Sequence, residues 1–294
     1  MEEREHTFYH WEYGLIVSLA STAGAIAPDF VDLFDGWPTA RGTVYALRDA
    51  NLENLRGIDM WVNIGQSADV GEFADALKDI GNPLFHSFAA DRNGDAFYGE
   101  ISAIPNVTEQ KMTDCVTGIN ALVRSLTNSA IIVLDGDRSD CQWGVDADAP
   151  EGSGLFGFAS LPSFFTRDYA ANSNDSYWLS NPDQPLEGFP TSMGFVGHEG
   201  KQQNLRTQIN HAMDAQRLAG TDGFDASPGF TLASLQQLMY ANRVFAAELV
   251  LDDVLTLCDS VGDDQTDVQR GCEVLANWDR LAEVDSQGTQ VFTE

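Results

Sequence analysis

The sequence predicts an α+β protein with a strand-rich first part, residues 1–143, a loop-rich part, 144–200, and a helical part, 201–294. Three observations lead to this division. Aromatic and β-branched runs between turn residues characterise the first part, and Gly, Pro, Asp, Asn and Ser are frequent in the second. In the third part, apolar residues recur at the spacing of an amphipathic helix. These patterns indicate a mixed fold with a helical end.

The first part contains five strand candidates. Residues 7–17 predict a strand pair with a turn near 12–14, and residues 43–47 predict a further strand. Residues 84–90 and 96–101 flank an Asn-Gly turn, which is a strong hairpin signal. The hairpin is therefore the best-defined strand prediction.

Two helices are expected between these strands. In residues 48–61 an apolar face contains Leu52, Leu55, Ile58 and Trp61. In the next helix, Ser67 is the expected N-cap, Asp69 suits the N-terminal dipole, and Gly81 closes the end.

The helical part is predicted to hold three helices, over 205–218, 231–257 and 267–281. The second has an apolar stripe made of Leu232, Leu235, Leu238, Met239, Phe245 and Leu249. Before them, residues 144–190 form long irregular connections, and loops of that length in a compact domain are usually functional.

The charge balance excludes two classes of partner. With 16 Lys+Arg and 45 Asp+Glu, the net charge is −29, which disfavours nucleic acid and anionic membranes. The longest uncharged stretch, which contains residues 14–27, is shorter than the roughly 20 residues of a spanning helix. Arginine supplies most of the positive charge, which is compatible with a saline habitat or with an ordinary acidic extracytoplasmic protein. We expect no nucleic-acid partner and no membrane span.

No metal or cofactor is predicted. Asp91, Asn93 and Asp95 imitate the start of a calcium loop, but Ala96 and Ser102 stand where that loop needs Gly and Glu. A plain hairpin tip is the alternative that we favour. The sequence also lacks a zinc pattern, a nucleotide-binding loop and a Gly-x-Ser-x-Gly elbow.

The five histidines fall in no catalytic motif. They are His6, His10, His86, His198 and His211. His6 and His10 are four apart, but in a strand-like stretch that spacing does not form a metal-binding face. An enzyme built on these histidines is a rival hypothesis without a motif to support it.

Four cysteines suggest an oxidising compartment. Cys115 and Cys141 flank an apolar run, and Cys258 and Cys272 bracket a short acidic loop, so these pairs are candidate disulfides with the connectivity left open. We expect a periplasmic or secreted protein. The first six residues lack the apolar region of a secretory signal, which suggests an incomplete chain.

Several long motifs resemble one family in the same order along the chain. They include Asn-Ser-Asn-Asp-Ser-Tyr-Trp-Leu-Ser-Asn-Pro at 172–182, Pro-Leu-Glu-Gly-Phe at 185–189 and Ala-Leu-Arg-Asp-Ala-Asn-Leu-Glu-Asn at 46–54. Over residues 7–279 the chain resembles the β-subunit of the penicillin acylase family, in particular its aculeacin A and N-acyl-homoserine lactone acylases. The resemblance implies that 1–294 forms part of an N-terminal-nucleophile αββα four-layer sandwich.

The resemblance also implies a reaction and its residues. In the family, an N-terminal serine attacks an amide with its own α-amine as base, and backbone and Asn donors hold the oxyanion. Asn174 matches the Asn donor, Arg206 matches its supporting arginine, and Trp37 and Trp61 resemble walls of the acyl pocket. Without this resemblance, Asn174 would be interpreted as a turn residue and Arg206 as a charge on a helix face. The two tryptophans would be interpreted as core aromatics.

The expected function is hydrolysis of a linear amide bond in an N-acylated substrate, such as an acyl-homoserine lactone, a lipopeptide or a penicillin. Met1-Glu2 supplies no nucleophile. We therefore expect a segment of a larger precursor whose partners include a missing α-subunit and the rest of the β-subunit. The alternative is a non-catalytic module that binds acylated ligands or a partner.

Overall fold

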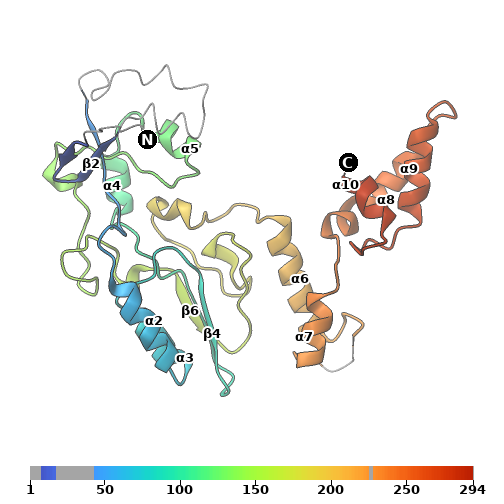
Figure 1. Ribbon diagram of the computed structural model, residues 1–294, viewed down its shortest axis with the longest axis horizontal. Helices are drawn as coiled ribbons and strands as arrows, with labels where there is room; N and C mark the ends of the chain where they lie inside the picture. The colour runs from blue at the N-terminus through green and yellow to red at the C-terminus, as the bar shows by residue number, and fades with distance from the viewer. Residues whose placement is uncertain (1–7, 18–42, 225–227, 294) are drawn as a thin grey trace, which may run out of the picture. The chain divides into compact units, whose positions relative to one another are not determined.

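The computed structural model describes residues 8–17, 43–224 and 228–293, which fall into two compact units (Figure 1). The first unit comprises residues 1–172 and 176–201, and the second comprises 173–175 and 202–294. Strands β1–β6 lie in the first unit, and helices α6–α10 lie in the second. The mixture of helices and small antiparallel sheets confirms the α+β class.

The first sheet has the order β1-β2-β3 and is antiparallel. Its strands are β1 His10–Trp11, β2 Gly14–Val17 and β3 Tyr45–Leu47. Leu15 of β2 pairs with His10 on one side and with Leu47 on the other. The predicted strand pair, its turn and the third strand are confirmed.

The second sheet has the order β4-β5-β6. It consists of β4 Ser87–Ala90, β5 Ala96–Gly99 and β6 Ser163–Thr166. Ala90 pairs with Ala96, and Gly94 in the turn has a φ of +85°, a left-handed value that favours glycine. The hairpin is confirmed, whereas β6 lies in a part for which no strand was predicted.

In the described residues of 1–143, four helices accompany the five strands of the part that was predicted to be strand-rich. They are α2 Arg56–Gln66, α3 Val70–Ala76, α4 Glu109–Asp114 and α5 Asn120–Leu126. Short 3-10 turns complete the first unit, and they are η2 Ser139–Cys141, η3 Phe158–Ser160, η4 Tyr177–Leu179 and η5 Thr191–Phe195.

Helix α2 differs from its prediction in start and in orientation. It begins at Arg56 instead of residue 48, because residues 49–54 form turns. Met60 is 3% exposed, whereas the expected apolar face is open to solvent. The residues expected on that face are Leu52, Leu55, Ile58 and Trp61, and each is more than 60% exposed. The first two lie before the start of the helix.

Helix α3 is capped by Asp69 instead of Ser67. The Oδ1 of Asp69 accepts a hydrogen bond from the backbone N of Glu72 at 2.9 Å. Ser67 instead ends α2, where its Oγ donates to the carbonyl of Asn63. Both residues are good N-caps, and the two-residue difference follows from where α2 stops.

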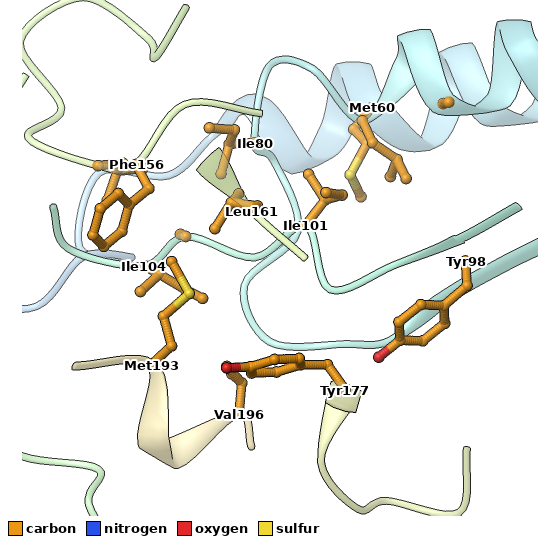
Figure 2. Close-up of a cluster of buried hydrophobic side chains, with 14 of the residues drawn as sticks. Met60, Ile80, Tyr98, Ile101, Ile104, Phe156, Leu161, Tyr177, Met193 and Val196 are labelled. Carbon is orange, nitrogen blue, oxygen red and sulfur yellow. The ribbon is translucent and has the colours of Figure 1, made fainter. Parts of the chain in front are cut away.

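The core of the first unit surrounds β5 (Figure 2). Phe97 and Tyr98 point to opposite faces of the strand and are both fully buried. The labelled side chains around them are Met60, Ile80, Ile101, Ile104, Phe156, Leu161, Tyr177, Met193 and Val196. Residues 97–104 and residues 177–196, which are far apart in the sequence, therefore share one core.

The second unit is helical. Its helices are α6 Leu205–Ala219, α7 Leu232–Met239, α8 Phe245–Cys258, α9 Thr266–Ala276 and α10 Gln287–Thr293. The first confirms the prediction for 205–218, while the single helix expected over 231–257 is divided in two. The division lies at Asn242, whose φ is +47° and whose carbonyl accepts from the N of Ala282 at 2.8 Å.

The core of the second unit is formed by residues outside the expected apolar stripe. Ala247, Leu251 and Leu275 form its small core. Four members of the stripe are at least half exposed, and they are Leu232, Leu235, Met239 and Leu249. Once the chain breaks at 240–244, the two halves no longer present a common face.

Both candidate disulfides are present. Cys115 and Cys141 have Cα atoms 5.3 Å apart, and Cys258 and Cys272 have Cα atoms 5.9 Å apart. These separations are usual for a disulfide. Among the described helices, none combines the length and apolar character that crossing a bilayer requires.

Candidate functional site

Asn174 occupies an exposed turn with an unusual backbone. Its φ is +55°, in the left-handed region that asparagine tolerates better than most residues. The turn formed by residues 173–175 belongs to the second unit, together with α6. The matching motif therefore places a carboxamide on the surface next to a helix start.

Arg206 reaches this carboxamide from the first turn of α6. Its Nη2 donates to the Oδ1 of Asn174 at 2.9 Å and also to the carbonyl of Ser173. Because a guanidinium can only donate, the atom of Asn174 that faces it must be the oxygen. The Nδ2 therefore lies on the other branch of the planar amide, and no group of the described residues accepts a hydrogen bond from it.

Two further contacts join the turn to α6. The Oδ2 of Asp175 accepts from the backbone N of Asn204 at 2.7 Å, and the Nδ2 of Asn210 donates to the Oγ of Ser173 at 3.3 Å. Asn204 is the N-cap of α6, with its side chain accepting from the N of Thr207. The residue types alone gave no signal for these contacts.

Of the two tryptophans that were predicted to line the acyl pocket, the structure describes Trp61. Trp37 lies outside the described residues. Trp61 belongs to the first unit, on the open face of α2, and is 63% exposed. Ile58 and Val62 are exposed beside it along the helix. The structure thus brings Asn174 and Arg206 together, and it places Trp61 on an uncovered apolar surface instead of in a core.

An apolar cavity of about 300 Å³ is a further feature of the first unit. Its walls come from β2, β3 and the run 130–134, with Val107 and Phe195 among them. At its edge the guanidinium of Arg48 lies 3.8 Å from the ring centre of Trp143. Sequence patterns gave no indication of this cavity.

A second polar cluster, the Glu100 cluster, is buried beside β5. It consists of His86, Tyr98, Glu100 and Ser102. The Nδ1 of His86 lies 2.7 Å from one carboxylate oxygen of Glu100 and 2.9 Å from the Oη of Tyr98. The Oγ of Ser102 donates to the other oxygen at 2.5 Å. Glu100 is 1% exposed, so its pairing is what makes its burial possible.

The remaining histidines belong to no metal-binding group within the described ranges. His6 lies outside those ranges, His10 is exposed, and His211 lies in the second unit. Burial and the nearby charges of Lys201 and Arg124 lower the pKa of His198. In residues 8–17, 43–224 and 228–293, no three His, Cys, Asp or Glu side chains are placed to hold a metal ion.

The side chain of Asp91 accepts hydrogen bonds within the hairpin tip. The Oδ1 of Asp91 accepts from the backbone N of Asn93 at 2.7 Å and from that of Asp95 at 3.3 Å. These are the contacts of an Asx turn. The three residues that imitate a calcium loop thus serve the turn itself.

Comparison with known proteins gives the family of the chain. A model of the family described as penicillin amidase matches residues 1–294. The chain is 38% identical over 299 residues to aculeacin-A acylase of Actinoplanes utahensis, covering 98% of this chain and 35% of that protein. It is 32% identical over 244 residues to the acyl-homoserine lactone acylase PvdQ of Pseudomonas syringae pv. syringae, covering 82% and 29%. The chain spans about a third of the length of these curated relatives, and it belongs to the penicillin amidase family.

Proposed function

We propose that the chain is the segment of an amidohydrolase that supplies the side-chain oxyanion donor, and that its parent protein cleaves a linear amide of an N-acylated substrate. The parent protein is the full product of the reading frame that contains these residues. The observation that carries the proposal is the contact between Arg206 and the Oδ1 of Asn174, which leaves the amide Nδ2 as an outward donor.

The chemistry requires a donor of this kind. When a serine oxygen attacks the amide carbon, the carbonyl oxygen becomes negative, and a fixed N–H stabilises it more than it stabilises the substrate. The carbon–nitrogen bond then breaks, the amine leaves with a proton, and water hydrolyses the acyl ester. Asn174 has the donor role, and Arg206 holds its orientation.

We place the nucleophile in the part of the parent protein that these 294 residues do not cover, with an α-subunit and the remaining β-subunit as partners. The coverage of about a third of each relative supports this. In the same proposal, those segments complete the αββα sandwich. Two disulfides favour a periplasmic or secreted location.

The substrates we propose have an apolar acyl group, as in acyl-homoserine lactones, lipopeptides or penicillins. The name acyl-homoserine lactone acylase supports the first class, and the name aculeacin-A acylase supports the removal of an acyl group. Trp61, exposed on the apolar face of α2, is a suitable wall for such a group. Replacing it by Ala should raise the KM for a long-chain substrate more than the KM for a short-chain one.

The test uses the parent protein with an N-dodecanoyl homoserine lactone, a lipopeptide and a penicillin, and measures released acid and amine by mass spectrometry. Asn174→Ala should lower kcat about 100-fold or more while KM changes little. Asn128→Ala is the matched control, because Asn128 is also exposed and has a φ of +48°. An active Asn174→Ala protein would contradict the donor role.

A non-catalytic acyl-binding module is the second candidate, and the 300 Å³ cavity favours it. The purified 294-residue chain is titrated with dodecanoate while its tryptophan fluorescence is followed. Saturable quenching that disappears in Val133→Phe, which fills the cavity wall, would support this candidate. Acyl release by the same chain would contradict both the non-catalytic module and our placement of the nucleophile elsewhere.

A further inference from the structure

Each of the three residues in the turn that carries Asn174 has a side-chain contact with α6 or its N-cap. Asn210 donates to the Oγ of Ser173, Arg206 donates to the Oδ1 of Asn174, and the N of Asn204 donates to the Oδ2 of Asp175. All of these groups belong to the second unit. The first two turns of one helix therefore define the position of the whole turn.

A left-handed residue needs such support. An asparagine with a φ of +55° can relax to other backbone conformations unless neighbouring contacts prevent it. Arg206 fixes the carboxamide, but its exposed side chain is long and has many rotamers. The short side chain of Asp175, by contrast, joins the turn directly to the backbone of α6.

The helix end strengthens this contact. The backbone N of an N-cap residue lies beside the first N–H groups of the helix, where the macrodipole favours a carboxylate. Asp175 places its Oδ2 there at 2.7 Å from the N of Asn204. The side chain of Asn204 is itself used to cap α6, at 2.9 Å from the N of Thr207. The anchor is thus a capped helix end.

We propose that Asp175 is a positioning residue for the oxyanion donor, with Asn210 as a weaker second one. This inference rests on the proposed function of Asn174. Asp175 does not touch the substrate; it holds the backbone of Asn174 so that the Nδ2 keeps one direction. Asp175→Asn retains an acceptor oxygen at the same place, whereas Asp175→Ala removes it.

The first experiment reports on orientation without any catalysis. The 294-residue chain is labelled with ¹⁵N-asparagine, and the Nδ2 signal of Asn174 is assigned by its loss in Asn174→Ala. Asp175→Ala should move this signal to the position of a freely rotating carboxamide, and Asp175→Asn should leave it in place. Asp69→Ala removes a comparable carboxylate from the start of α3 and should leave the signal unchanged.

The second experiment is a double-mutant cycle on kcat in the parent protein. Asp175→Ala should lower kcat about tenfold with KM unchanged, and should have no further effect when Asn174 is already Ala. Equal losses in both backgrounds, or an unmoved Nδ2 signal, would overturn the inference. If Asn174→Ala itself keeps full activity, the proposed function fails, while the signal of Asn174 still decides the positioning role.

Discussion

The Glu100 cluster and the turn at Asn174 are both polar networks, but they differ in how completely they are satisfied. Each carboxylate oxygen of Glu100 has a partner inside the first unit. At Asn174, the oxygen is bound and the nitrogen has no partner among the described residues. The first network is complete without a ligand, and the second has one donor left over. On this difference we base a structural role for Glu100 and the proposed functional role for Asn174.

The largest expected change in stability is at Glu100. Replacing it by Ala leaves the buried hydroxyl of Ser102 without its acceptor and removes the carboxylate partner of His86, which should cost about 3 kcal/mol of unfolding free energy. Urea unfolding of the 294-residue chain measures this. Glu151→Ala, at an exposed position, is the control. A loss below about 1 kcal/mol would mean that the network is not structural.

The next largest change in stability is expected at Asp214, on α6. Burial raises the pKa of Asp214 from its ordinary 3.8 to about 6. The folded state therefore holds a proton that the unfolded state has lost, and stability falls as the pH rises from about 4 through 6. Asp214→Asn should raise the unfolding free energy at pH 8 by up to about 2 kcal/mol, after allowance for partial exposure.

Thermal unfolding at pH 4 and pH 8 measures this effect. The gain from Asp214→Asn should be present at pH 8 and largely absent at pH 4. Asp263→Asn, on an exposed loop, provides the comparison. An equal gain at both pH values would show that the replaced charge was not the cause.

Arg206 should affect stability less and activity more. Both of its contacts lie at the surface, so Arg206→Ala should lower the unfolding free energy by about 1 kcal/mol or less. In the parent protein, kcat should fall at least tenfold, because Asn174 loses its orientation. Arg206→Lys keeps the charge but loses the planar guanidinium whose Nη2 reaches both acceptors, and should recover stability better than kcat.

The smallest change in stability is expected for Asn174→Gly. Glycine adopts the left-handed backbone without strain, which offsets the lost contact with Arg206, so the change should stay within about 0.5 kcal/mol. Asn128→Gly, with no such contact to lose, should gain slightly more. A loss above 1 kcal/mol at residue 174 would make the turn a structural network like that of Glu100.

Local signals in the sequence were sufficient for some elements. The Asn-Gly turn located the β4–β5 hairpin, and apolar periodicity located α6 almost to its ends. Periodicity failed for α2 and for 231–257, since it shows that a face is apolar but not what covers it. The break at Asn242 depends on pairing with residues 280–282, which are distant in sequence.

The site was predictable only in part. Resemblance identified Asn174 and Arg206, whose contact the structure contains, while their catalytic roles stay predictions. Asp175 and Asn210 were missed because their partners depend on how the turn lies on α6. Glu100 was missed for a similar reason: its charge suggested the surface, and only its three-dimensional neighbours explain its burial.

The cysteines pair in the order in which they are synthesised, the first with the second and the third with the fourth. Each bond becomes possible before the next cysteine of the chain has been made. Within these 294 residues, an oxidant that acts once Cys141 has been made therefore meets a single possible pairing of the cysteines synthesised so far, and that pairing is the native one.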